Sequence, residues 1–281
     1  MRISLPCLLL LAAVTLPQAA AAQSGGEPDA GGDIIIAGAG VGMIPDHEGS
    51  NDYRLVPVPG AIGRIGGLDF VYVGNRISVN LIHDPVGPGW NFILGPVASV
   101  GFNRTSLKSI DDSRIRALGK VGTSVELGGT AGIARQGVIT SDYDRLSATV
   151  SIRHDVADGH GGTLINPTLS YMTPLSTRAM TMLFVSATHA DGNYARTYYT
   201  ITPGQSVDSG LPVFNARSGW KDLTIGGAVD VSLTGTLRGG LSLIGGVAYT
   251  RLMNDFAASP VVSIAGSRSQ WMAGLGLAYT F

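Results

Sequence analysis

One short stretch of the chain carries residue types that could bind a cation. Asp46, His47, Glu48 and Asp52 place three carboxylates and an imidazole close together in the sequence. Such side chains ligate divalent cations, so a cation or ligand site is one interpretation of this stretch. Their spacing matches no fixed ligand pattern, and the interpretation that we favour is a solvated external loop.

A second stretch, residues 154–162, contains Asp155 and the pair Asp158-Gly159, which superficially suggest a calcium loop. The alternating carboxylates and the terminal Glu of an EF-hand are missing, and no tandem glycine-rich nonapeptides are present. We therefore predict no metal ligands there.

The histidines offer a catalytic alternative. His154, His160 and His189 would lie near the outer rim of a membrane barrel, where some barrels hydrolyse lipids with a serine, a histidine and an orienting Asp or Asn. No Gly-x-Ser-x-Gly elbow is present. A lipid hydrolase is thus the weakest of our functional hypotheses, and we predict no catalytic residue and no cofactor.

The stretch Gln270–Phe281 indicates the element type that must position these residues. In a strand, alternate side chains point to opposite faces. One face would carry Trp271, Ala273, Leu275, Leu277, Tyr279 and Phe281, and the other Met272, Gly274, Gly276, Ala278 and Thr280. An apolar face with terminal aromatics opposite a small, weakly polar face is typical of a strand in an outer-membrane barrel. We expect Tyr279 and Phe281 to be the assembly signal that the barrel-assembly machinery recognises.

The N-terminal region predicts export. Arg2, an apolar run from Leu8 to Leu16 and a small-residue stretch ending at Ala22 are typical of a cleaved signal peptide over residues 1–22. Residues 23–32 would form a flexible periplasmic arm, and the barrel would occupy 33–281. Cleavage would remove Cys7, the only cysteine, so no disulfide is expected.

The composition further limits the class of protein to which this chain can belong. The chain has 40 glycines and a formal net charge of −1. No basic patch suggests nucleic acid. After Ala22, no apolar run reaches the roughly 18 to 20 residues of a transmembrane helix. The lipid bilayer of the outer membrane would therefore be crossed by strands.

Alternation along the chain predicts an all-β fold, an antiparallel up-and-down barrel of about twelve strands. The first six candidates are Asp33–Gly42, Leu55–Arg64, Leu68–Gly74, Arg76–His83, Trp90–Phe102 and Leu118–Gly128. The remaining six are Tyr143–His154, Thr163–Met172, Arg178–His189, Lys221–Leu233, Arg238–Met253 and Gln270–Phe281.

Loop lengths give an independent test of this count. With both termini in the periplasm, connections after odd strands face outward and should be long. The long set includes Met43–Arg54, Asn103–Ala117, Asp155–Gly162, Ala190–Trp220 and Asn254–Ser269, and the short set Ile65–Gly67, Asp84–Gly89, Thr173–Thr177 and Thr234–Leu237. Two connections break the rule: Asn75 is too short for an external loop, and Gly129–Asp142 is too long for an internal turn. For the loop Ala190–Trp220, two interpretations are equally open: a plug that binds a ligand or a partner, and a lid that packs on itself.

Several local sequences together resemble the MipA/OmpV family of outer-membrane proteins over most of the mature chain. The main one runs from Pro45 to Arg54 and includes Glu48, Gly49, Ser50, Asp52 and Tyr53. The others are Ser186-Ala187-Thr188, Tyr198–Pro203, Ser206–Pro212, Gly219-Trp220-Lys221-Asp222, Tyr249–Leu252 and Ser259-Pro260. His47 stands where the family often has an aromatic residue, and Thr200 where it often has Gly.

The resemblance implies a non-enzymatic scaffold that binds a lytic murein transglycosylase and bridges it to a peptidoglycan synthase. The expected periplasmic turns are short, whereas a standard interface needs roughly 800 Å² per partner. Turn Gly129–Asp142 and the N-terminal arm would have to supply that surface. The alternative is a porin-like channel for small solutes, because the inward Gly, Ser, Thr and Ala positions leave room in a twelve-stranded barrel.

Overall fold

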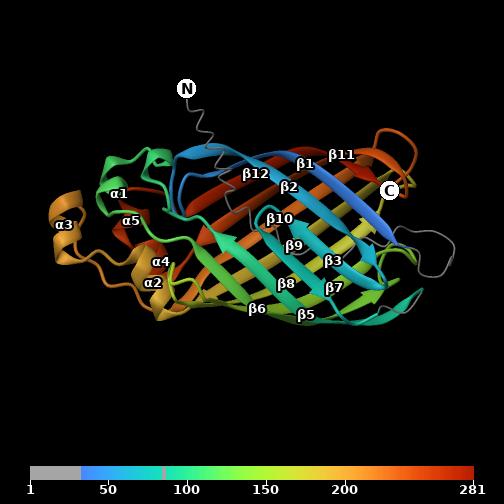
Figure 1. Cartoon of the computed structure of the whole chain (residues 1–281), viewed down its shortest axis with the longest axis horizontal. Helices are drawn as coiled ribbons and strands as arrows, with labels where there is room; N and C mark the ends of the chain where they lie inside the picture. Colours follow the sequence, from blue (N-terminus) through green and yellow to red (C-terminus); the bar gives the residue numbers. More distant parts are fainter. Residues whose placement is uncertain (1–32, 84–86) are drawn as a thin grey trace, which may run out of the picture.

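The computed structural model describes residues 33–83 and 87–281, and these form a closed antiparallel β-barrel of twelve strands (Figure 1). The proposed signal peptide 1–22 and arm 23–32 lie outside the described residues. The strands are β1 (Ile34–Pro45), β2 (Tyr53–Ile65), β3 (Leu68–Val73), β4 (Arg76–Asn80), β5 (Gly89–Gly101), β6 (Ser124–Gln136), β7 (Arg145–Asp155), β8 (Thr163–Pro174), β9 (Ala179–Ala190), β10 (Gly219–Ser232), β11 (Gly240–Leu252) and β12 (Ser269–Thr280). Each strand pairs with its neighbours in sequence, and β1 pairs with β12 to close the ring.

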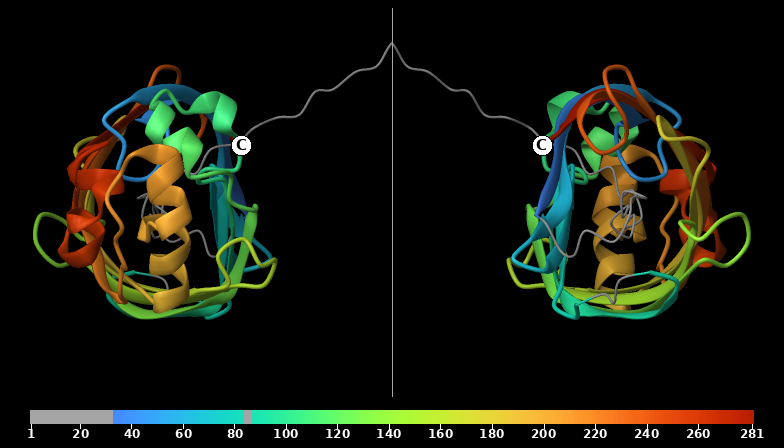
Figure 2. Two further views of the ribbon diagram at one scale, coloured as in Figure 1. Left: turned by 90° about the vertical axis from the view of Figure 1, so that its left-hand side faces the viewer. Right: turned by 90° about the vertical axis from the view of Figure 1, so that its right-hand side faces the viewer.

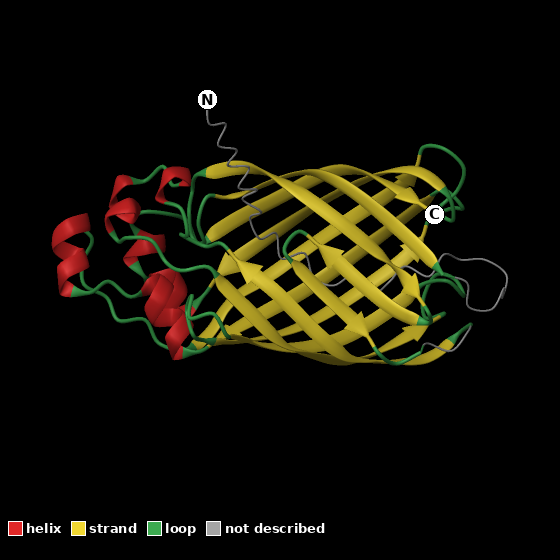
Figure 3. Ribbon diagram, in the orientation of Figure 1, coloured by secondary structure: helices red, strands yellow, loops and turns green. Residues whose placement is uncertain are grey.

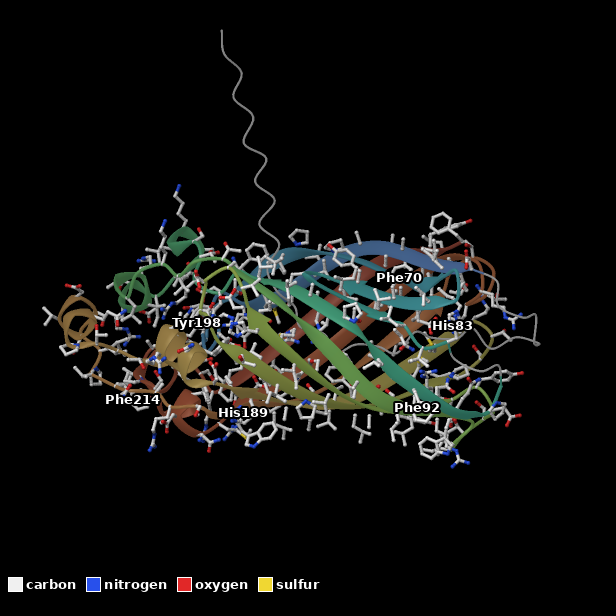
Figure 4. The ribbon with its side chains drawn as sticks, turned by 60° about the horizontal axis from the view of Figure 1, so that its bottom comes forward. Phe70, His83, Phe92, His189, Tyr198 and Phe214 are labelled. Carbon is white, nitrogen blue, oxygen red and sulfur yellow. The ribbon has the colours of Figure 1, made fainter. Side chains whose placement is uncertain are left out.

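The outward and inward faces of β12 alternate as its sequence predicts. Trp271, Leu275 and Tyr279 are about half exposed on the outside, whereas Gln270 and Ala278 are buried inside. Phe92 of β5 likewise lies on the outer surface (Figure 4). Apolar side chains therefore cover the outer face of the wall, and closure pairs most of its backbone groups, as suits a lipid environment.

The longest connections all lie at one end of the barrel. All the helices gather at one end, and short turns and the C-terminus lie at the other (Figure 3). The helices are η1 (Leu107–Ser109), α1 (Ser113–Ala117), α2 (Gly192–Tyr199), α3 (Pro203–Ser209), α4 (Asn254–Ala258) and α5 (Pro260–Ser263). The three connections that carry helices follow β5, β9 and β11, as the alternation predicts, whereas those after β1, β3 and β7 are no longer than the longest turns at the other end. We therefore expect the helical end to be the external one. Within the described residues, no helix is long and apolar enough to span a membrane.

One strand boundary that the sequence predicts is wrong. The sixth strand begins at Ser124 rather than Leu118, and it continues through Gly129 to Gln136. The reason lies in the external cap: Ile115 and Leu118 are buried in its apolar core, so this apolar run belongs to α1 and its C-cap. The predicted long internal turn Gly129–Asp142 therefore does not exist as such, and the true connection, residues 137–144, is short.

The external connections form a cap with its own hydrophobic core. Tyr199 of α2 packs edge-on against Phe256 of α4 at 5.0 Å between ring centroids, and both side chains are fully buried. Val261 of α5 and Ile115 of α1 join the same cluster. The segment between β9 and β10 thus packs as a lid on itself and on neighbouring loops. An end view shows its helices lying across the mouth of the barrel (Figure 2).

Candidate functional site

The loop between β1 and β2 turns into the barrel mouth instead of projecting into solvent. Asp46, His47 and Ser50 are almost completely buried. The interpretation of this stretch as a solvated loop is therefore wrong. The reason is that its polar groups find partners within the protein: His47 Nδ1 binds Asp46 Oδ1 at 2.6 Å, and Asp52 N–H donates to Ser50 Oγ at 2.9 Å.

The four residues that could have ligated one cation are split between two places. Carboxylate oxygens of Asp46, Asp52 and Asp111 lie within 4.8 Å of one another. Asp46 is already engaged, because Asp111 N–H donates to its second oxygen at 2.9 Å. Burial raises the pKa of Asp46, but the hydrogen bond from His47 and other donors hold it below its usual value. Glu48 points away from this group.

Glu48 is the centre of a network that joins loop, lid and wall. Tyr194 and Tyr199 of α2 donate their hydroxyls to Glu48 Oε2 at 2.6 and 2.9 Å. The Lys221 ammonium forms an ion pair with the other carboxylate oxygen. A register shift in β10 between Trp220 and Asp222 lets Lys221 point inward, where it is 5% exposed.

The electrostatics of this network favour a charged Glu48. Burial alone would raise its pKa, but the Lys221 ammonium and the two tyrosine hydroxyls hold the pKa of Glu48 below its usual value. Burial, reinforced by the negative charge of Glu48, raises the pKa values of Tyr194 and Tyr199. The tyrosines therefore stay protonated and act as donors, which suits a latch that fixes the lid rather than a proton-transfer site.

A second polar cluster lies on the opposite wall. Glu126 of β6 accepts hydrogen bonds from Arg153 at 2.9 Å and Ser99 at 2.8 Å, and its other oxygen lies 3.2 Å from His160 Nε2. Gly162 N–H donates to His160 Nδ1, so a neutral ring would donate through Nε2. Arg76 of β4 donates to Ser151 at 3.0 Å.

The three histidines proposed for lipid hydrolysis do not meet. His160 is buried in the mouth, whereas His154 lies on the outside and contacts Thr163. His189, also on the outer surface, stacks edge-on against Trp220 at 5.5 Å (Figure 4). Between residues 33 and 83 and from 87 onward, no serine hydroxyl is hydrogen-bonded to a histidine ring.

The carboxylate of the suspected calcium loop is satisfied by backbone. Asp155 accepts N–H groups of Val125, Ala157, His160 and Gly161 at 2.6 to 3.1 Å. These bonds fix the turn between β7 and β8 and occupy both oxygens. The arrangement explains the sequence pattern without a cation.

The lumen contains two adjoining cavities. One, of about 190 Å³, lies beneath the cap and is lined by the charged groups of both clusters. The other, of about 220 Å³, is lined only by apolar residues and glycines of β1, β2, β3, β9, β10, β11 and β12. Met272 lines both cavities and packs against the buried pair Ile44 and Val56. The lumen therefore changes from polar to apolar at Met272.

Neither the partners of Glu48 nor the cluster around Glu126 was predicted from the sequence. One usable signal was present: Glu126 and Arg153 are charged residues at inward positions of membrane strands, where charges are costly and usually paired. The inward turn of Lys221 could not be anticipated, because it depends on the bulge in β10.

The two residues expected to signal assembly lie at the closing seam. Tyr279 is opposite Ala37 of β1 and Leu241 of β11, and Phe281 N–H donates to Ile35 O at 2.9 Å. Their rings pack at 4.9 Å and remain largely exposed. Their role in assembly stays a prediction.

Comparison with known families identifies the chain. Residues 37–281 match the family described as MltA-interacting protein MipA. The chain belongs to the MipA family. The match spans all twelve strands apart from the first residues of β1, and it includes the loop from Pro45 to Tyr53. Together with the barrel, family membership places this MipA-family protein in the outer membrane.

Solved structures with a similar fold are outer-membrane barrels. An anion-selective porin from Comamonas acidovorans is 12% identical, with 89% of this chain and 99% of that chain covered and a TM-score of 0.37. The translocator domain of the autotransporter NalP from Neisseria meningitidis is 14% identical, with 90% of each chain covered and a TM-score of 0.37. OprD from Pseudomonas aeruginosa is 11% identical at a TM-score of 0.37 over 80% of this chain, which spans about half the length of OprD. Among curated proteins, no sequence matches.

Proposed function

We propose that this MipA-family protein is a non-enzymatic scaffold that holds a lytic murein transglycosylase, and through it a peptidoglycan synthase, at the inner face of the outer membrane. The observation that carries the proposal is the match of residues 37–281 to a family described as interacting with MltA. The cap favours a scaffold function rather than that of a wide pore, because its buried core and the Glu48 latch cover the mouth of the barrel.

The periplasmic rim offers one surface suited to a protein partner. The turn between β6 and β7 exposes Ile139 and Tyr143, and the next turn along the chain, between β8 and β9, exposes Leu175. Thr140 of the first turn binds Thr173, next to the second, at 2.7 Å, so the two turns lie side by side. Exposed apolar side chains on adjacent turns are typical of a protein contact.

Asp144 makes this rim rigid. Its carboxylate accepts the N–H groups of Val138, Ile139 and Thr140 and the hydroxyl of Tyr171, at 2.5 to 2.8 Å. Burial raises the pKa of Asp144, but these donors hold it well below its usual value. A pre-organised turn lowers the entropy cost of binding.

The test is co-purification of a lytic murein transglycosylase with the folded barrel from detergent-solubilised outer membranes. We expect Ile139→Asp combined with Leu175→Asp to reduce the retained enzyme at least tenfold. Thr236→Asp, on the exposed turn between β10 and β11, is the matched control and should retain it. No retention by the wild-type barrel, or equal retention by the rim variant, would contradict the proposal.

A second candidate function is a gated route for small solutes. The two lumen cavities that meet at Met272 favour it. If Met272 is the constriction, Met272→Gly should raise the single-channel conductance in planar bilayers above that of the wild type. A conductance indistinguishable from a bare bilayer in both proteins would exclude this role.

A further inference from the structure

The barrel wall contains a stretch with a missing neighbour. Strands β3 and β4 are short, and their hairpin ends at Gly74 and Asn75 part-way along the barrel (Figure 1). Residues 60–65 of β2 pair with β3 and Pro59 accepts one bond from the β3–β4 turn, whereas residues 53–58 pair with β1 alone. The external half of β2 is therefore a strand edge within an otherwise closed barrel.

Two prolines lie on this edge. Gly74 N–H donates to Pro59 O at 2.8 Å, which shows that the backbone groups of Pro59, and by alternation those of Pro57, point toward the missing neighbour. Proline has no N–H, so two donors that would otherwise face lipid unpaired are absent. Within sheets, proline occurs at such edges, at the first residue of a strand and at bulges. The two prolines thus suit a stretch of the wall in which β2 has no neighbouring strand on one side.

The polar cavity behind this edge is lined by four carboxylates as well as by cations, and it contains buried donors that have no partner. Arg54, Arg76 and Arg153 line it, and the last two are 7% and 5% exposed. Each has one buried guanidinium nitrogen, Nε of Arg54 and Arg76 and Nη1 of Arg153, with no acceptor among the described residues. Glu126, the carboxylate in contact with Arg153, already accepts from His160, Ser99 and Arg153 Nε, and it makes no bond to the three unpartnered nitrogens. Buried donors without partners are costly, and a bound anion would satisfy them.

The adjoining cavity could hold an apolar chain. Inward glycines of β1 and β12, including Gly40, Gly274 and Gly276, leave space that Met182 and Phe184 of β9 border from across the lumen. Its volume of about 220 Å³ exceeds the roughly 150 Å³ of an apolar cavity known to take up benzene.

We propose that the lumen binds a single-chain anionic amphiphile. Its carboxylate or phosphate head lies among Arg54, Arg76 and Arg153, its chain passes Met272 into the glycine-lined cavity, and it enters from the outer leaflet beside the unpaired edge of β2. Asn75 and Phe102, which flank that edge, line the polar cavity. This inference goes beyond the scaffold role and does not depend on it.

Binding of radiolabelled dodecanoate and dodecyl phosphate to the barrel in amphipol tests the proposal. We expect one molecule per barrel, with at least tenfold weaker binding of dodecyltrimethylammonium and of inorganic phosphate. Comparing dodecanoate with dodecyl phosphate distinguishes a fatty-acid ligand from a phospho-lipid ligand. Equal affinity for the cationic amphiphile would overturn the proposal that an anionic head binds the arginines. Equal affinity for inorganic phosphate would overturn the proposal that the apolar cavity binds the chain.

Two variants test the binding of the head and the binding of the chain separately. Arg76→Gln should weaken binding of both anionic amphiphiles about tenfold, because one charged donor is lost. Gly274→Leu should block the chain: a Cβ there meets the Val41 carbonyl oxygen at an ordinary 3.6 Å, so the backbone need not move. Gly129→Leu, on the outward face of β6, is the matched control: it lines neither cavity, a Cβ there meets the Gly95 carbonyl oxygen at 3.7 Å, and it should bind as the wild type does. Heat-shifted electrophoretic mobility verifies that each variant is folded. Unchanged affinity in folded Gly274→Leu or Arg76→Gln would refute the site.

Discussion

At the scale of single residues, one carboxylate connects the β1–β2 loop to both the lid and the wall. Glu48 accepts hydrogen bonds from two tyrosine hydroxyls of α2 and forms an ion pair with the ammonium of Lys221 in β10. Because Lys221 is buried, each charge depends on the other, and removing one partner of a buried pair leaves an uncompensated charge. The lid is thus held by polar chemistry at its base and by apolar packing above it.

Replacing the cation tests this latch. We expect Lys221→Met to lower the free energy of unfolding by about 1–3 kcal/mol, because Glu48, whose side chain is 26% exposed, would lose its counter-charge in a partly buried position. Urea titration in lipid vesicles, followed by tryptophan fluorescence, measures the loss. Arg217→Met is the control: it removes an ion pair whose arginine is 81% exposed, and stability should change little. Equal losses in the two variants would mean that burial of the pair is unimportant.

The stability that this latch contributes should fall as the pH is lowered. The pKa of Glu48 is held below its usual 4.5, so its contribution is complete above about pH 4.5 and is lost as pH falls through the lowered folded value. Glu48→Gln cannot respond. We therefore expect the stability difference between wild type and Glu48→Gln to be constant from pH 7 to 5 and to shrink below pH 4.5. A difference that grows on acidification would contradict the direction of the pKa shift.

At the scale of elements, alternation predicted the strands well because lipid allows few solutions. Each outward face must be apolar and each backbone group paired, so β7, β10 and β12 can be recognised from side-chain pattern alone. The failure at β6 has the opposite cause. Its glycines and alanines give little contrast between faces, and the apolar run before it packs into the cap instead.

The closing strand provides a second element-level prediction. Deletion of Phe281, or Phe281→Lys, should reduce the amount of barrel in the outer membrane while export continues. Before closure the last strand has an unpaired edge that must be delivered to β1, and Phe281 bonds Ile35 at that seam. Quantitative immunoblotting of membrane and periplasmic fractions measures the effect. Outer-membrane levels equal to wild type would show that Phe281 is dispensable.

At the scale of the whole molecule, parity of the strands determines which end each loop occupies. The sequence was sufficient for that arrangement, since twelve strands with termini at one end place every odd connection at the other. It was not sufficient for the interior. The pairing of Glu48 with Lys221 joins residues distant in sequence across a mouth whose width only closure defines, and Glu126 meets Arg153 of the neighbouring strand β7 only in the register that these strands adopt.

Topology can be tested at the point of the lid farthest from the barrel. Asp208 is exposed on α3, a helix with a capping box that packs mainly against α1. An epitope tag inserted beside Asp208 should leave the barrel folded, because exposed tips tolerate insertion. We expect antibody to label intact cells carrying this tag. A tag beside Thr236, on the opposite rim, should be labelled only after permeabilisation. The reverse pattern would mean that the barrel is inserted the other way, and the apolar rim at Ile139 and Leu175 could then not meet a periplasmic partner.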